Sequence, residues 1–242
     1  MIFGIRRAVE LTDFRKSLDG LKGIPIELAL PYKIEQYLKT RQALPELVRY
    51  ITKKGIRCQS VHAPQGAIAD NSFMSWAPEV AQFTMDSGAR VVVFHPEQYN
   101  SSSRLYCQNI AMQRIKELQS LTPVVIAVET FGGRRRVLTP SELVYHKLPM
   151  VLDVSHVREE ESREMIKINT RNIVGIHLSA IGVDPKTGKN GHHLPINDFC
   201  FEILDSLKKA GWNGVVTLEY LPWHHDRLLK DREILEKRYS HS

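Results

Sequence analysis

Six short apolar runs in this 242-residue chain each end in a side chain that can bind a metal ion. These side chains are His62, His95, Glu129, Asp153, His177 and Glu219. A carboxylate or imidazole beside a dry core is costly unless it finds a partner. A metal ion satisfies several such groups together; the alternative is a buried network of ion pairs and hydrogen bonds. We expect Glu129, Asp153, His177 and Glu219 to hold one divalent cation (Mn²⁺, Co²⁺, Mg²⁺ or Zn²⁺), with positions left open for substrate.

The roles of three histidines, His62, His95 and His156, remain open between two alternatives each. His62 and His95 could hold a second metal ion with Glu129 as the bridge, or each could be a hydrogen-bonded histidine of the core or rim. His156 follows Asp153 by three residues. It could be a further ligand, or it could bind a hydroxyl group of the substrate.

Two other segments carry candidate substrate-binding residues. We expect one of His192 and His193 to face the site, the alternative being a solvated loop. The segment with Arg134, Arg135 and Arg136 comes just after the run that ends at Glu129. Three arginines in a glycine-rich turn could clamp the phosphate of a sugar phosphate or of a nucleic acid, or could form a solvated loop.

Eight apolar segments must position these side chains. They span Ile2–Ile5, Ile24–Ala29, Ile56–His62, Arg90–His95, Val124–Glu129, Met150–Asp153, Ile173–Leu178 and Val215–Tyr220. Most are rich in Val and Ile and almost continuously apolar, which is typical of strands buried on both faces of a parallel sheet. Glu27, in the second segment, could point to the floor of the pocket or to a partner lysine.

Segments with helical periodicity separate the predicted strands. The helix that begins near Pro45 ends at Gly55, and Thr139 to Glu142 is a capping box. Eight strand–helix units without a linker predict an α/β fold, a single (β/α)₈ TIM barrel over residues 1–242. An open doubly wound sheet would carry a glycine-rich turn after its first strand, and the sequence has none there. In the barrel, the C-terminal strand ends form the active site, where the candidate ligands fall.

Composition narrows the class of protein further. The net charge of +6 would attract nucleic acid or phosphorylated metabolites, unless it only reflects solvated outer helices. The three cysteines form no CxxC motif, which favours a reducing compartment. No apolar run is long enough to span a membrane, and the N-terminus does not look like a signal peptide. We therefore expect a cytoplasmic protein; an oligomer is possible, and no face identifies one. His224 and His225 are expected at the surface.

The chain resembles the xylose isomerase-like TIM-barrel superfamily, which includes sugar phosphate isomerases and epimerases and endonuclease IV (AP endonuclease family 2). The segments that carry the resemblance are Val61-His-Ala-Pro64, Phe94-His-Pro96, Val128-Glu-Thr130, Leu152-Asp-Val-Ser-His156, Ile176-His-Leu-Ser179 and Leu218-Glu-Tyr220. Their order along nearly the whole chain is more specific than any one of them.

The isomerase-like branch implies one divalent metal at Glu129, Asp153, His177 and Glu219. The two glutamates would exchange a proton with a bound hydroxy-ketone, one as base and the other as acid, and His156 would bind the substrate.

The endonuclease IV branch implies three zinc ions that attack a phosphodiester. His62, His95 and Glu129 would hold the first and the isomerase-type ligands the second. His156 and an Asp-x-His pair would hold the third. That pair falls at Asn190-Gly-His192, so its acidic member is missing.

We therefore expect a metal-dependent isomerase or epimerase that acts on a small sugar or sugar phosphate. The alternative is an endonuclease IV-like enzyme with two or three zinc ions that cleaves abasic DNA. A related lyase or dehydratase is a further possibility. A module that only binds a metal or ligand would have little use for so many ligands.

Overall fold

The computed structural model describes residues 1–96, 98, 104–132 and 136–239, and in it eight parallel strands close into a barrel. The barrel strands are β1 (Ile2–Ala8), β2 (Pro25–Ala29), β3 (Arg57–His62), β4 (Val91–Phe94), β5 (Val125–Glu129), β6 (Met150–Asp153), β7 (Ile173–Leu178) and β10 (Val215–Leu218). They follow one another around the ring in chain order, and β10 pairs with β1 to close it. The predicted (β/α)₈ barrel is confirmed.

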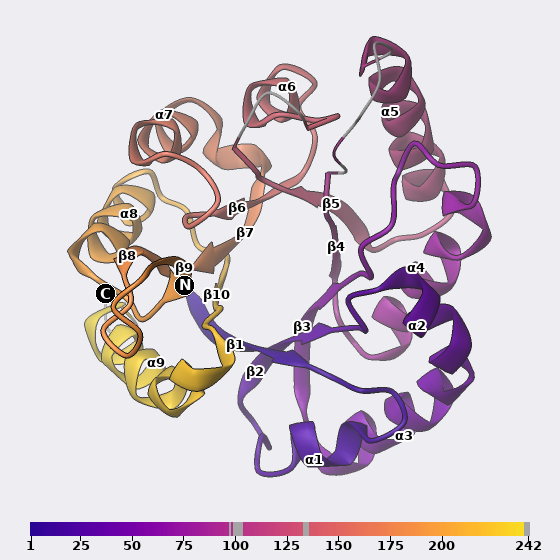
Figure 1. Ribbon diagram of the computed structural model, residues 1–242, viewed down its shortest axis with the longest axis horizontal. Helices are drawn as coiled ribbons and strands as arrows, with labels where there is room; N and C mark the ends of the chain where they lie inside the picture. Colours follow the sequence, from indigo (N-terminus) through magenta and orange to yellow (C-terminus); the bar gives the residue numbers. More distant parts are fainter. Residues whose placement is uncertain (97, 99–103, 133–135, 240–242) are drawn as a thin grey trace.

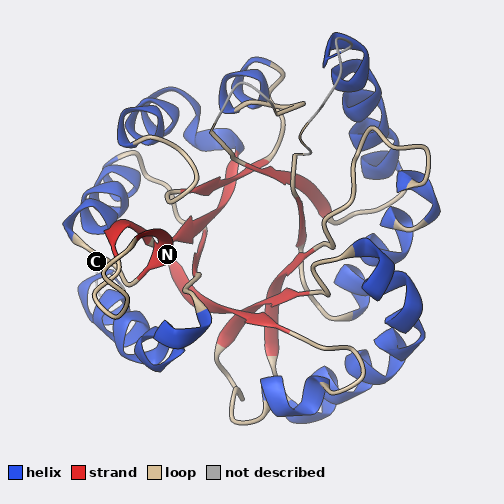
Figure 2. Ribbon diagram, viewed as in Figure 1, coloured by secondary structure: helices blue, strands red, loops and turns tan. Residues whose placement is uncertain are grey.

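Helices surround the barrel on the outside (Figures 1 and 2). They are α1 (Phe14–Leu18), α2 (Ile34–Thr40), α3 (Leu44–Lys54), α4 (Ala77–Asp86), α5 (Arg104–Ser120), α6 (Pro140–Tyr145), α7 (Glu159–Asn169), α8 (Asp198–Lys209) and α9 (His225–Tyr239). The predicted ends are present: α3 stops at Gly55, which has a φ of 63°, and the Thr139–Glu142 capping box starts α6. Among the described residues, no helix is long and apolar enough to cross a membrane.

Strand alternation sorts side chains into two buried layers. Side chains on the outer face of the strands pack under the helices and form the main core. A separate small cluster of Val93, Ala127 and Val151 fills the inside of the barrel. Successive residues of a strand point to opposite faces, so the residue two positions later also points inward. For Ala127 and Val151 that residue is Glu129 and Asp153, which places both carboxylates above the inner apolar layer.

A short antiparallel hairpin, which the sequence did not predict, follows β7. Its strands are β8 (Ala180–Val183) and β9 (Asn190–Leu194), and it carries both His192 and His193. Figure 1 shows the hairpin outside the ring of barrel strands, and Lys186, between its two strands, lies 3.1 Å from Asp226 in the first turn of α9. The loop after β7 is therefore an ordered element that can hold a side chain against the site.

Candidate metal centre

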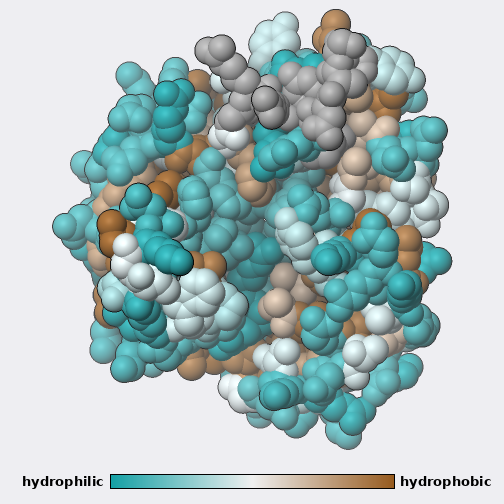
Figure 3. All heavy atoms as spheres, viewed as in Figure 1, coloured by the Kyte–Doolittle hydropathy of each residue, from teal (hydrophilic) through white to brown (hydrophobic). Residues whose placement is uncertain are grey.

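The C-terminal ends of the barrel strands bring all six predicted ligands together. Three groups of side chains each have ligand atoms within 4.8 Å of one another. The groups are His62–His95–Glu129, Glu129–Asp153–His177–Glu219 and Asp153–His156–His193. Seen along the barrel axis, the surface is hollowed near its centre, and the side chains around the hollow are mostly hydrophilic (Figure 3). The arrangement is that of a candidate centre for one to three metal ions.

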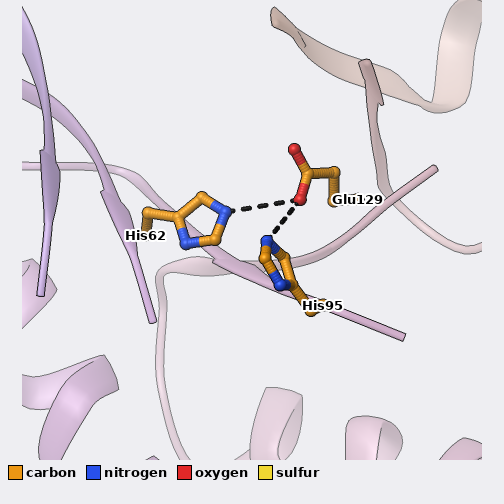
Figure 4. A group of neighbouring side chains, drawn as sticks. All are labelled: His62, His95 and Glu129. Carbon is orange, nitrogen blue, oxygen red and sulfur yellow. Dashed lines mark hydrogen bonds and ion pairs between the residues drawn. The ribbon is translucent and has the colours of Figure 1, made fainter. Parts of the chain in front are cut away.

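Glu129 divides its two oxygen atoms between two of these groups. Its Oε2 lies 2.6 Å from His95 Nε2 and 3.4 Å from His62 Nε2 (Figure 4). Its Oε1 lies 2.5 Å from His177 Nδ1. The carboxylate is fully buried; burial alone raises its pKa, but His95 and His177 outweigh this and hold the pKa of Glu129 well below its usual range. An ionised carboxylate with one oxygen facing each group is suited to bridge two cations.

The second group contains carboxylate oxygens that the protein leaves incompletely satisfied. Asp153 Oδ2 and Glu219 Oε2 are buried and have no hydrogen-bond partner among the described residues. The His177 Nδ1 atom lies 3.7 Å from the first oxygen and 3.3 Å from the second. Such orphaned atoms are costly. A divalent cation would bind them together with Glu129, so the residues present fit a metal ion.

Glu27 contacts the His177 ring on the side opposite to Glu129. It is 1% exposed, and its Oε2 accepts from His177 Nε2 at 3.1 Å and from Ser60 Oγ at 2.8 Å. Burial lowers the pKa of His177, but Glu27 and Glu129 outweigh it, so this pKa is raised well above its usual value. A carboxylate on the far nitrogen of a metal-binding imidazole fixes its orientation and leaves the other nitrogen for the ion. Glu27 therefore points into the barrel, one of the two placements that the sequence left open.

Arg6 is a member of the site that sequence reasoning missed. It lies in β1, and its guanidinium pairs with Glu219 and lies 3.9 Å from Glu27 Oε1. Burial raises the pKa of Glu219, but Arg6 and His177 outweigh it and lower this pKa to about 2. Glu219 has a side chain that is 13% exposed, so it is the most open carboxylate of the four around His177. Arg6 thus fixes the ionised carboxylate nearest to the mouth.

The third group includes His193 and not His192. His193 Nε2 lies 3.1 Å from His156 Nε2, and Asp153 Oδ2 lies 3.5 Å from the other nitrogen of His156. Because β9 alternates its faces, His192 points elsewhere, and its Nδ1 lies 2.7 Å from the carbonyl oxygen of Ser155. The acidic member of this group is therefore Asp153, and the expected ligand pair at Asn190-Gly-His192 does not form it.

The hairpin is fastened to the loop after β10 near the third group. The Leu221 amide donates to the carbonyl oxygen of His193 at 2.9 Å. Asp184 accepts from Trp223 Nε1 at 2.8 Å and lies 3.0 Å from His224 Nε2. His224 is 1% exposed, so its prediction as a surface residue was wrong: it is buried because it packs against this carboxylate. His225 is half-buried, with Nε2 3.1 Å from the Tyr220 carbonyl oxygen.

The predicted arginine clamp is described only in part. Arg134 and Arg135 lie outside the described residues. Arg136 donates to the carbonyl oxygen of Pro96 at 3.0 Å, and its guanidinium lies 4.3 Å from the centre of the Phe131 ring. Phe131 is a second residue that the sequence analysis missed.

The Phe131 ring lies between two sides of the mouth. Its centre is 4.0 Å from that of the His156 ring and 5.0 Å from that of the His95 ring. A cavity of 660 Å³ opens on the His156 side, with Ser155 and His192 in its wall. A smaller cavity of 330 Å³ opens on the His95 side, with Arg136 in its wall. A substrate above the metal ligands would therefore have space on both sides.

Comparisons with known proteins identify the class of fold. Neither a family model nor a curated protein matches the chain. Solved structures match over nearly its whole length, among them xylose isomerase domain proteins, sugar epimerases and endonuclease IV. These belong to the superfamily that the sequence motifs resemble, and at these low sequence identities they establish the fold.

Three of these structures illustrate the match. A D-tagatose 3-epimerase-like protein has a TM-score of 0.72 and 18% identity, covering 99% of this chain and 97% of that one. A 3-keto-D-glucoside 4-epimerase from E. coli has a TM-score of 0.68 and 13% identity, with 99% of both chains covered. Endonuclease IV from Thermus thermophilus has a TM-score of 0.65 and 14% identity, covering 98% of this chain and 100% of that one.

Proposed function

We propose that the protein is a divalent-metal-dependent isomerase or epimerase that acts on a small sugar or sugar phosphate. The observation that carries this proposal is the pair of glutamates in the second ligand group. Glu129 is fully buried, whereas Glu219 reaches the mouth, and both lie within 4.8 Å of the ligand atoms of Asp153 and His177. Two carboxylates from strands on different sides of one centre are suited to exchange a proton with a substrate held between them.

The residues of the site have distinct roles in this reaction. Glu129, Asp153, His177 and Glu219 would hold the ion, which would polarise the carbonyl and hydroxyl oxygens of a hydroxy-ketone when bound. One glutamate removes the proton from the carbon beside the carbonyl, and the other gives a proton back. Return to the same carbon from the opposite face is epimerisation. Return to the former carbonyl carbon, with the hydroxyl proton passing to the former carbonyl oxygen, is isomerisation. His156, at the edge of the larger cavity, binds a substrate hydroxyl.

The matching structures support this proposal at the level of the fold. Two of those described above are named as an epimerase or an epimerase-like protein, and both align over nearly the full chain. A third matching structure, of a protein called IOLI, contains a bound zinc atom, at 16% identity and a TM-score of 0.63. Sugar chemistry and metal binding therefore both occur on this fold.

A second candidate is an endonuclease IV-like phosphodiesterase, and a specific observation favours it. The two oxygens of Glu129 face different ligand groups, and a third group lies around His156. Two or three zinc ions in such sites would activate a hydroxide and neutralise a phosphodiester. Both candidates use the second ligand group, so replacing Glu219 abolishes turnover in each and does not distinguish them.

Metal content and activity together distinguish the two candidates. The full chain is purified without chelator or an affinity-tag metal, and its metals are counted by elemental analysis. One manganese, cobalt or magnesium ion per chain, with interconversion of keto-sugars or their phosphates, supports the isomerase. Two or three zinc ions with cleavage of an abasic duplex support the phosphodiesterase. A protein that binds no metal even after divalent ions are added would refute both.

Two matched pairs of variants sharpen this test. Of the three ligand groups, His62→Ala and His95→Ala change only the first, so full activity in both would exclude a role for a metal ion there. Glu219→Gln is compared with Glu46→Gln, which changes a glutamate on α3 whose side chain is 51% exposed. The first substitution should abolish turnover, and the second should not change it.

A further inference from the structure

The smaller cavity of the mouth has the character of an anion subsite. It measures 330 Å³ and is lined by Tyr32, Gln65, Gly66, Ala67, His95, Gln98 and Arg136; we call it the Arg136 pocket. None of the described residues that line it carries a carboxylate, whereas the adjacent metal centre is rich in carboxylates. Its side chains offer a guanidinium, a phenol and two carboxamides, all of which can donate hydrogen bonds. A negatively charged group is the ligand that this lining suits.

Arg136 is held in place by a backbone carbonyl oxygen and an aromatic ring. One Nη atom donates to the Pro96 carbonyl oxygen, and the Phe131 ring supports the guanidinium at 4.3 Å. No carboxylate of the described residues forms an ion pair with it, unlike Arg104, which pairs with Glu142. An arginine braced by a ring and a carbonyl, whose other side-chain N–H groups bond to none of the described residues, is preorganised to bind an anion.

Backbone hydrogen bonds join the loops that form the walls of the Arg136 pocket. Isolated β-bridges join Lys33 to Gln65 and Gln98 to Arg136, so loops from four strands are tied in pairs. Gly66 in the wall packs against Trp76, since a Cβ at this glycine would lie 2.6 Å from the Trp76 Cζ2 atom. A wall fixed in this way needs little rearrangement when a ligand binds, which favours affinity.

We infer that the Arg136 pocket binds the phosphate group of a sugar phosphate, so that the sugar lies over the metal ligands. This inference rests on the proposed function and specifies its substrate class. His95 connects the two places: it lines the pocket, and its Nε2 lies 2.6 Å from Glu129. Arg136, Tyr32 and the two glutamines provide more donors than a carboxylate needs and suit the three terminal oxygens of a phosphate monoester. A phosphodiester has only two such oxygens and must leave the pocket at both esters.

The test compares two probes that differ by one ester group. Methyl phosphate and dimethyl phosphate are titrated by calorimetry into the metal-loaded full chain, with no turnover involved. We expect methyl phosphate to bind, and Arg136→Ala to weaken its binding about tenfold or more, the loss expected for a charge-assisted hydrogen bond. Tyr32→Phe removes one hydroxyl from a side chain that is 58% exposed, so the fold is kept; we expect a loss of about threefold.

The matched control is Arg171→Ala. Arg171 is an exposed residue of the short 3-10 helix just before β7, at the opposite end of the barrel from the mouth. The Arg171→Ala substitution removes the same charge as Arg136→Ala and should leave the binding of methyl phosphate unchanged. Equal binding by Arg136→Ala and the unmodified protein would overturn the inference. So would dimethyl phosphate that binds as tightly as methyl phosphate, because that would indicate a nucleic-acid backbone.

A kinetic comparison separates this inference from the proposed function. If sugar phosphates are interconverted, Arg136→Ala should raise KM for them and not for the free sugars. Binding of methyl phosphate that depends on Arg136, without turnover of any sugar, would keep the subsite and refute the isomerase. If the unmodified protein and Arg136→Ala turn over sugar phosphates with the same KM, the isomerase is supported and the subsite is refuted.

Discussion

Removal of divalent metal should lower the melting temperature of the protein. Glu27, Glu129, Asp153 and Glu219 crowd around His177, and each has a side chain that is at most 13% exposed. Their buried oxygens are only partly satisfied, so a cation stabilises the folded state, in which these groups converge. At a free metal concentration of about 100 times Kd, binding contributes about 2.7 kcal/mol to the free energy of unfolding. A chain of this size gains about 2 to 4 °C per kcal/mol, so we expect a shift of about 5 to 11 °C.

The assay is a thermal melt of chelator-treated protein, followed by titration with zinc, manganese, cobalt or magnesium. Asp153→Asn is the control, because it removes a ligand shared by two groups and should abolish most of the shift. Melting curves that coincide with and without every one of these ions would refute the reasoning. A shift of equal size in Asp153→Asn would show that the metal binds elsewhere.

Three further results are expected. Glu27→Gln should weaken metal binding by about 10- to 100-fold, measured against a competing chelator, because Glu27 orients the imidazole at the centre of the site. Asp184→Asn should lower the melting temperature at neutral pH. Although burial raises the pKa of Asp184, its hydrogen-bond donors outweigh this and lower it to about 2. The ionised group therefore stabilises the fold above about pH 4, and this contribution is lost as the pH falls to about 2. The melting temperatures of Asp184→Asn and the unmodified protein should thus converge over that range. Burial raises the pKa of Cys58 to about 12 and that of Cys200 to about 11, so a thiol reagent at pH 8 should modify only the half-buried Cys107 until the protein unfolds.

The barrel strands could be predicted closely because strands buried on both faces are apolar almost without interruption. The prediction for Met150–Asp153 and Ile173–Leu178 agrees with β6 and β7 at both ends. The candidate ligands at the strand ends could be located for the same reason, since they interrupt these apolar runs. The hairpin could not: Asn190-Gly-His-His193 has no strand-like pattern, and its position depends on long-range contacts such as that of Asp184 with Trp223.

The cationic side of the site could not be predicted from the sequence either. The first strand was expected to end at Ile5, but β1 continues to Ala8 and turns Arg6 into the barrel. An arginine after an apolar run is usually solvent-exposed. This one is buried by Glu27 of β2 and by Glu219 at the end of β10, and Glu219 lies more than 200 residues away in the sequence. Similarly, the choice between His192 and His193 depends on the register of β9, which local sequence does not contain.

The distribution of charge around the site links the kind of metal to the reaction. In the second group Glu129, Asp153 and Glu219 would supply oxygen ligands, which suit magnesium and manganese, and His177 is its one imidazole. The first group adds His62 and His95; burial, Arg6 and His95 lower the pKa of His62, which favours its neutral, metal-binding form. Neutral imidazoles favour zinc or cobalt and discriminate against magnesium. Activity supported by magnesium would therefore require the second group alone, as in the isomerase. An activity restricted to zinc and cobalt, and lost in His62→Ala and His95→Ala, would require the first group as well, as in the phosphodiesterase.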